Sequence, residues 1–466
     1  MQIPILSGIR ADETGSFRTA YPRNMKPVPT AQGISVGYLK PAEGVELIAT
    51  GQGLDRGGIV WRGQAYRVQG SKLVRQNADD TVTVLGDVGG SEYATLDYSF
   101  DVLGIASGGK LHYWDGASLT VVTDPDIGYV KDVRFVAGYW LTTDGEFLVV
   151  TELNDRYSVN PLKYGSVESN PDDVIAVDEL KNEIYAFGRY TIEIFQNVGG
   201  DNFPFQRIEG AQVAKGAIGT HSYCQFMGTF AFMGGAENEP PAIWIVTSGN
   251  ATKLSSAEVD TLLLGYTETQ LQTVVIEARL DRGHQNLMVH LPDQCLVYDG
   301  AASQALGEPA WYVLTSSIVG LGQYRARTHL WAYDKWTCAD PTTSSIGALV
   351  DTVSTHYGAV TGWEFGTLIT YNEGRGAVFH ELELVGLPGR VVFGLDPVIW
   401  TSYSLDGETW SQERLIKAGR QGERLKRMVW RQQGKMSHYR IQRFRGTSDA
   451  RISLARLEAT IEPLAA

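Results

Sequence analysis

Acidic side chains are the first residues of this chain that could support catalysis, because two convergent carboxylates can act as general acid and general base. Closely spaced acids include Asp79 with Asp80, Asp124 with Asp126, and Asp172 with Asp173. Each pair falls in a predicted loop, and loop acids of this kind typically form solvated turns. The sequence therefore favours turns over a catalytic carboxylate pair.

Histidine and cysteine spacing gives no metal-binding pattern. The eight histidines never form an HExxH motif or a close i, i+4 pair, and we interpret His290 as a strand residue with an ordinary partner. Cys224, Cys295 and Cys338 are far apart, which favours buried free thiols. The sequence has no phosphate-binding loop and no nucleophile elbow. It predicts no catalytic, cofactor-binding or metal-binding residues, no cofactor and no enzymatic activity.

The strongest local motif is SLDGETW, from Ser404 to Trp410. It approaches the Asp-box of sialidase-type propellers but lacks one residue between Asp406 and Gly407. We interpret it as an Asp-Gly hairpin turn held by Trp410. A propeller glycosidase or glycan-binding protein is the alternative function that the motif leaves open.

Basic residues gather near the C-terminus of an otherwise acidic chain. The net charge is −13, yet the segment from Arg414 to Arg456 has thirteen lysines and arginines against two acids. Alternation along strands predicts a positive face that docks on an acidic partner. A solvated face and contact with passing nucleic acid are the alternatives. The predicted partner-binding residues are Lys426, Arg427, Arg431, Arg440, Arg443 and Arg445.

The elements that must position these residues are predicted from a recurring strand–turn–strand unit. Its turns fall near Gly70, Gly108, Asp144 and Arg189, at intervals of 36 to 45 residues. Small sheets repeated at this period indicate an all-β propeller, in which each sheet is buried between its neighbours. We predict six blades over residues 51–360, with a seventh around 329–340 as the alternative, and a short helix within 254–280.

Two further regions flank the predicted propeller. Residues 1–50, rich in proline, are predicted to form an extended arm anchored by Phe17, Tyr21, Tyr38 and Leu39. Residues 361–466 have longer strand-like segments, among them ELELVGL, RVVFGL and RISLARLEATI, and are predicted to form an all-β, sandwich-like domain with the basic face. No stretch approaches 18 apolar residues, so we expect no membrane insertion.

Several motifs in combination resemble one protein family. Three segments are similar to the packaged-DNA stabilisation proteins, also called tail-hub or nozzle proteins, of short-tailed bacteriophages, the podoviruses. These segments are FRTAYPRNMKPVPTAQGISVGYLKPAEGV (17–45), DRYSVNPLKYGSVESNPDDVIAVDELKNEIYAFGRYTIEIFQNVG (155–199) and VAKGAIG (213–219). The matching positions are Tyr21, Pro22, Asn24, Gly37, Tyr38, Leu39, Gly44, Asp155, Arg156, Tyr157, Ser158, Pro171, Asp172, Phe187, Gly188, Thr191, Ile192, Glu193, Lys215 and Gly216.

This resemblance implies a structural protein of the virion tail, assembled in the host cytoplasm. It implies a ring, a hexamer, that closes the portal-adaptor channel after packaging, retains the genome and forms the conduit for its ejection. The implied partners are other copies of the chain, the portal-adaptor (head-to-tail connector) protein, and a tail fibre, tailspike or needle protein. Contact with genomic DNA is expected to be transient and non-specific, since a net-negative channel repels the duplex.

Overall fold

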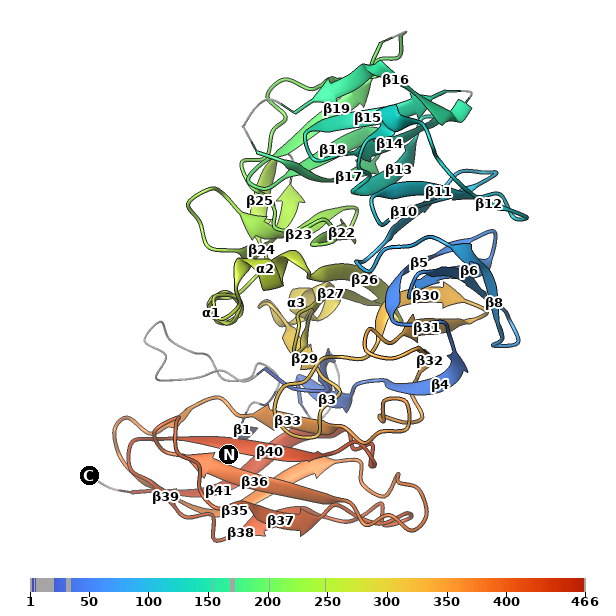
Figure 1. Cartoon of the computed structure of the whole chain (residues 1–466). Coiled ribbons are helices and arrows are strands. Elements are labelled where there is room, and N and C mark those ends of the chain that lie inside the picture. The colour runs from blue at the N-terminus through green and yellow to red at the C-terminus, as the bar shows by residue number, and fades with distance from the viewer. Residues whose placement is uncertain are drawn as a thin grey trace.

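The computed structural model of the chain shows a β-propeller stacked on a β-sandwich (Figure 1). The all-β class and both architectures predicted from the sequence are confirmed. The structure describes residues 2–3, 5, 21–30, 35–153, 155–167, 172–200, 202–247 and 249–464.

Blades 1 to 4 are four-stranded antiparallel sheets in chain order. Blade 1 comprises β5 (Asp55–Trp61), β6 (Gln64–Gln69), β7 (Lys72–Gln76) and β8 (Val82–Asp87). Blade 2 comprises β9 (Thr95–Tyr98), β10 (Leu103–Ser107), β11 (Lys110–Trp114) and β12 (Leu119–Val121). Blade 3 comprises β13 (Asp132–Val136), β14 (Tyr139–Thr143), β15 (Phe147–Glu152) and β16 (Asp155–Ser166), and blade 4 comprises β17 (Val174–Leu180), β18 (Glu183–Gly188), β19 (Ile192–Asn197) and β20 (Phe205–Arg207).

The four predicted turns join the second and third strands of these blades. Gly70 and Gly108 have φ values of 56° and 59°, a left-handed conformation that glycine adopts at low cost. Asp144 and Arg189 lie in the equivalent turns, between β14 and β15 and between β18 and β19. The strands beside these turns are buried, and successive blades pack their apolar faces together. The repeat seen in the sequence is therefore the central hairpin of each blade.

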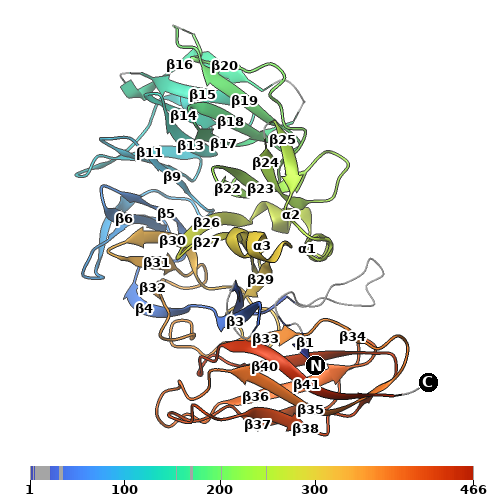
Figure 2. The ribbon, with the colours of Figure 1, turned by 180° about the vertical axis from the view of Figure 1, so that it is seen from behind.

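Blades 5 and 6 follow, separated by two short helices. Blade 5 comprises β21 (Gly216–Ala217), β22 (Tyr223–Phe226), β23 (Thr229–Gly235), β24 (Ala242–Thr247) and β25 (Asn250–Lys253). Blade 6 comprises β26 (Val275–Asp281), β27 (His284–His290), β28 (Cys295–Asp299) and β29 (Trp311–Leu314). The helices lie beside these blades (Figure 2) and are α1 (Ala257–Leu263), α2 (Glu268–Gln272) and, between β28 and β29, α3 (Gly300–Leu306).

The helix predicted within 254–280 is confirmed as α1. The Ser256 side chain accepts a hydrogen bond from the backbone N–H of Val259, as an N-cap does. A 3₁₀ turn, η1 (Pro125–Ile127), precedes blade 3. Among the described residues, no helix has the length and apolar character needed to cross a lipid bilayer.

Blade 7 combines strands from two distant parts of the chain. It comprises β30 (Arg327–Ala332), β31 (Lys335–Ala339), β32 (Ser345–Val350) and β4 (Gly44–Thr50), and β4 pairs with β32. The described propeller therefore has seven blades, and the prediction of six is corrected to its alternative of seven. The predicted boundary at residue 50 also shifts, because the last seven residues assigned to the arm form β4.

The sandwich packs two sheets face to face below the propeller (Figure 1). The first sheet, which we call the arm sheet, has the order β2 (Met25–Pro29), β3 (Gly37–Pro41), β41 (Leu454–Pro463), β35 (Ala377–Gly386) and β38 (Met428–Arg431), with β1 (Gln2–Ile3) on β41 and β39 (Lys435–Met436) on β35. The second sheet, which we call the far sheet, has the order β33 (Gly362–Gly366), β40 (Tyr439–Thr447), β36 (Val398–Ser404) and β37 (Arg414–Lys417), with β34 (Thr370–Tyr371) on β40.

Candidate functional site

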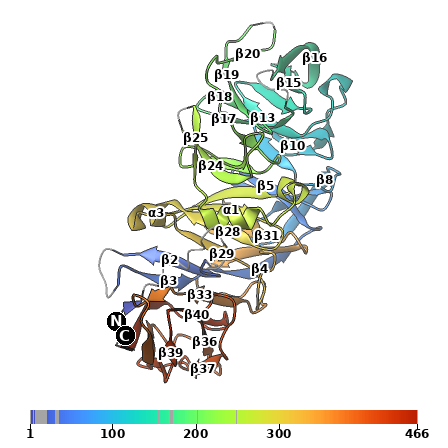
Figure 3. The same cartoon turned by 90° about the vertical axis from the view of Figure 1, so that its left-hand side faces the viewer.

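Residues 21–30 and 35–41 of the N-terminal segment lie between the two domains (Figure 3). The Tyr21 hydroxyl is 2.5 Å from Ser256 Oγ at the start of α1. Leu39 is fully buried in the sandwich core, opposite Leu454 in the ladder, and Tyr38 beside it is half-buried. Phe17, the fourth predicted anchor, lies outside the described residues.

Asn24 connects the propeller to the sandwich through its side-chain amide. Its Nδ2 donates to the carbonyl oxygens of Thr315, at 2.9 Å, and of Gly362, at 2.7 Å. Its Oδ1 accepts from the Thr315 backbone N–H at 3.0 Å. Since Thr315 follows the last strand of blade 6 and Gly362 begins the sandwich strand β33, one buried side chain holds the domains in register. Asn24 was recognised from the sequence only as part of the family motif.

Arg440 does not belong to the predicted basic face. Residues 440, 442 and 444 of β40 share one parity and point into the sandwich, and Arg440 is 1% exposed. Its guanidinium donates to the Gln433 carbonyl and to Gln442 Oε1 and lies 3.8 Å from the Tyr403 ring centroid. Burial lowers the pKa of Arg440 to about 10. The prediction was wrong here because alternation places Arg443 and Arg445 on one face, whereas Arg440 lies at the opposite parity of the same strand and was assigned to that face as well.

The other five predicted cations divide between two surfaces. Arg443 and Arg445 lie on the outer side of the far sheet, where both pair with Glu413. Arg443 also stacks on Trp410, and Arg445 stacks on Trp400.

Arg427 and Arg431 lie on the arm sheet, and their partners are the acids of β35. Arg427 Nε is 2.8 Å from Glu383 Oε1, and Arg431 Nε is 3.5 Å from Glu381 Oε2. Lys426 pairs with Glu423 at 3.5 Å. The acidic neighbours therefore offset much of the predicted positive charge.

A group of exposed apolar residues that the sequence prediction missed lies at one end of the sandwich. We call it the sandwich tip and define it by the apolar Leu387, Val392, Phe393 and Leu425 and the basic Arg390 and Arg424. Phe393 is 87% and Leu425 96% exposed. A backbone hydrogen bond from Gly422 to Gly389 joins the two loops that carry these residues. RVVFGL, predicted as a strand of the sandwich, mostly forms one of these loops, so its Val392 and Phe393 side chains are exposed.

The SLDGETW segment forms the turn after β36. Asp406 Oδ1 accepts from the backbone N–H groups of Glu408, at 2.9 Å, and Thr409, at 2.8 Å. The hydrogen bond from the Thr409 hydroxyl is the first of the contacts that lower the pKa of this exposed carboxyl. Trp410 stacks against Arg443 rather than closing the turn. Asp406 thus has the role of a turn former, which agrees with the turn interpretation.

An open cavity of about 570 Å³ lies at the centre of the ring of blades. Its lining comes from the first strands of blades 1 to 4 and 6, from β22 of blade 5 and from segments that precede these strands, and includes Asp97, Arg134, Asp178, His221 and Glu277. Burial is the largest cause of the raised pKa of Asp97 and of the lowered pKa of His221, to about 3. The cavity is therefore polar, with several ionisable groups held away from bulk water.

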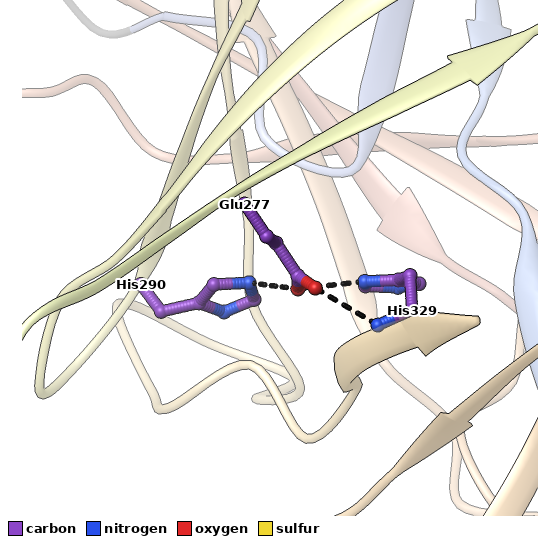
Figure 4. A group of neighbouring side chains, drawn as sticks. All are labelled: Glu277, His290 and His329. Atoms are coloured by element: carbon purple, nitrogen blue, oxygen red, sulfur yellow. Dashed lines mark hydrogen bonds and ion pairs between the residues drawn. The ribbon is translucent and has the colours of Figure 1, made fainter. Parts of the chain in front are cut away.

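Glu277 joins two histidines at the edge of this cavity (Figure 4). His290 Nε2 is 2.6 Å from Glu277 Oε1, and His329 Nδ1 is 2.7 Å from the same oxygen. The His329 backbone N–H donates to Glu277 Oε2 at 2.8 Å. Burial lowers the pKa of His329. Burial alone would raise the pKa of Glu277, but the two neighbouring imidazoles have the larger effect and lower the Glu277 pKa well below its ordinary value. No spacing in the sequence marks this group, because its members come from β26, β27 and β30.

Comparisons with known proteins cover both domains. Residues 1–354 match the family model described as "Bacteriophage P22 Gp10, beta-propeller", and residues 362–462 match the model described as "Bacteriophage P22 Gp10, beta-sandwich". The chain is 26% identical over 456 residues to "Tail hub protein gp10" of Salmonella phage P22, covering 93% of this chain and 94% of that protein.

Similar solved structures include two bacterial proteins. BamB from Moraxella catarrhalis is 12% identical, with 74% of this chain and 99% of that chain covered and a TM-score of 0.37. PorZ of Porphyromonas gingivalis is 12% identical, with 80% of this chain and 46% of that chain covered and a TM-score of 0.40.

Proposed function

This chain belongs to the bacteriophage P22 Gp10 family, and from that membership we propose how it acts in the phage tail. It is a structural tail hub protein of the podovirus type, located in the virion tail. The observation that carries this assignment is that the match spans the propeller and the sandwich together. The glycosidase alternative is not favoured, since its one motif is a turn.

The mechanical role that we propose is closure of the portal-adaptor channel by a ring of copies, six by family resemblance. The ring retains the packaged genome and later becomes its exit conduit, and it turns over no substrate. The net charge of −13 supports passage of DNA, because an acidic wall repels phosphates and lets the duplex slide. DNA contact is then transient and non-specific. A tail fibre, tailspike or needle protein attaches to the same ring.

The sandwich tip is the surface that we assign to the portal-adaptor protein. Exposed contiguous apolar side chains rimmed by charges are typical of protein interfaces. Arg390 and Arg424 form no ion pair within the described part of the chain, so they remain available to an acidic partner. The predicted cations Lys426, Arg427 and Arg431 follow directly along the chain, whereas Arg443 and Arg445 lie on the other sheet.

Attachment to purified portal-adaptor complexes tests this assignment. We expect wild-type chain to sediment with the complexes, and Phe393→Asp or Leu425→Asp to reduce its attachment at least tenfold. Leu162→Asp is the matched control, because Leu162 is a leucine of the propeller that is 81% exposed. Attachment of both tip variants at the wild-type level would remove the tip from the interface. Failure of the wild-type chain to attach would instead refute the proposed partner.

A further inference from the structure

We propose that Glu277, His290 and His329 form a binding site for one divalent transition-metal ion, best matched by Zn²⁺, at the seam between blades 6 and 7. Two imidazole nitrogens and one carboxylate are a common protein ligand set for zinc. The ligand atoms of the three residues lie within 4.8 Å of one another. The inference is independent of the proposed tail function.

The backbone positions all three side chains toward one point. In the β26–β27 ladder Val275 is opposite His290, so Glu277 is the diagonal neighbour of His290 on the same face. His329 approaches from β30, and its own backbone N–H fixes the second oxygen of Glu277. Figure 4 shows both imidazoles directed at the carboxylate from opposite sides. Three separate strands therefore bring their donor atoms together without any motif in the sequence.

The electrostatics of the site favour a cation. The side chains of His290 and His329 are 7% and 1% exposed and that of Glu277 is 17% exposed. Within the described residues the ion pairs of Glu277 are with these histidines, and none is with a lysine or arginine. A buried carboxylate with such partners is costly to desolvate. A divalent ion would supply the missing positive charge.

The geometry can accommodate an ion after a small movement. Zinc at about 2.0–2.1 Å from each donor places tetrahedral ligands roughly 3.3 Å apart. The present nitrogen–oxygen distances are 2.6 and 2.7 Å, and the three ligand atoms lie within 4.8 Å of one another. The Glu277 oxygen must therefore withdraw by about 0.6 Å from each nitrogen, and the two imidazole nitrogens on either side of it must reach the same separation of about 3.3 Å through changes in the side-chain torsions. Glu277 also lines the central cavity, which gives an entry path and water for the remaining coordination position.

The role of the ion would be structural, because it would link the first strand of blade 6 to the first strand of blade 7. Blade 7 is the blade that the N-terminal strand β4 completes. An ion at this seam would strengthen the propeller at the point where its circle closes. It would raise the thermal unfolding temperature by binding the folded chain alone.

Equilibrium dialysis of the full chain against Zn²⁺, after treatment with a chelator, tests the site. We expect one zinc per chain by elemental analysis and a thermal unfolding temperature that rises with zinc and falls again with excess chelator. His290→Gln and Glu277→Gln should weaken zinc binding by at least about 100-fold, more than is typical when a supporting group is lost. His284→Gln is the matched control, because His284 forms an imidazole–carboxylate pair with Asp299 in the same blade.

Two results would overturn the proposal. One is a folded wild-type chain that retains no zinc above the level of a protein without such a site. The other is unchanged stoichiometry and affinity in the folded Glu277→Gln and His290→Gln variants. Should either variant fail to fold, Co²⁺ added to the wild-type chain decides: a visible absorption band of four- or five-coordinate cobalt supports the site, and a spectrum of free aqueous cobalt refutes it.

Discussion

Val45 of β4 lies opposite Leu349 of β32 in the outer ladder of blade 7, although the two residues come from opposite ends of the propeller sequence. The Val45 backbone N–H also donates to the Thr355 carbonyl at 2.9 Å, and its carbonyl accepts from Tyr357 at 2.7 Å. The circle of blades is thus closed by backbone hydrogen bonds and by the burial of one apolar side chain. The stability of the closed circle therefore depends on β4, a strand that comes before all the other blade strands in the sequence.

Val45→Ala tests the strength of this closure. The Val45 side chain is 1% exposed, and the loss of two buried methyl groups should lower the free energy of unfolding by about 2 kcal/mol. Leu47→Ala on the same strand is the control, since Leu47 is 52% exposed and its loss should cost less than about 0.5 kcal/mol. Denaturant titration followed by tryptophan fluorescence measures both. Equal destabilisation by the two variants would mean that β4 does not close the propeller as described.

Arg440 and Arg443 stand three positions apart on β40 and should respond differently to substitution. Arg440→Met leaves the Gln433 carbonyl and Gln442 Oε1 without their buried donor, which should cost about 2–4 kcal/mol of stability. Arg443→Met removes a partly exposed ion pair worth at most about 1 kcal/mol. Thermal unfolding of the two variants compares them. A smaller loss for Arg440→Met than for Arg443→Met would contradict the inward orientation of Arg440.

His356 should make the protein sensitive to mild acid. Its Nδ1 is 2.8 Å from Ser316 Oγ, and burial, followed by the charge of Arg325, lowers its pKa from 6.5 to about 4. Because the folded pKa is the lower one, the unfolded chain takes up the proton first. The stability contribution is complete above pH 6.5 and falls by up to about 3 kcal/mol as the pH drops to 4.

Unfolding free energies measured from pH 7.5 to 4 check this dependence. His356→Gln should make the wild-type profile less steep between pH 6.5 and 4, and the slope that remains should come from other buried imidazoles such as His221. His380→Gln should leave the profile unchanged because the His380 side chain is 52% exposed. Parallel curves of unfolding free energy against pH for wild type and His356→Gln would show that the His356 imidazole takes up its proton equally well in the folded and the unfolded chain.

The strand–turn–strand repeat was sufficient to predict a propeller because each blade hairpin is local in sequence. Blade number was harder to predict, since β4 joins blade 7 from far upstream and the helices α1 and α2 lengthen the interval between blades 5 and 6. The basic tract was visible as composition. The division of these basic residues between two sheets could not be predicted, because the order of the strands in each sheet determines where Arg427 and Arg443 lie, and no local sequence pattern encodes that order.

The group of ionisable side chains at the seam between blades 6 and 7 escaped prediction for the same reason. Glu277, His290 and His329 meet only when blades 6 and 7 pack, and no spacing rule for metal ligands includes strands from adjacent blades. Phe393 of the sandwich tip was also misplaced, since an apolar run resembles a core strand until its neighbours are known. The local spacing of apolar residues predicts strands and helices well, whereas the candidate sites in this chain depend on contacts between segments that are distant in sequence.

Genome retention by phage particles that lack this chain tests the tail hub account most directly. Such particles should package DNA to full length and then lose it, so that little DNA remains protected from added nuclease. Purified wild-type chain, added immediately after packaging, should restore protection. Particles without the chain that keep their DNA as well as complete particles do would contradict the proposed closure of the channel.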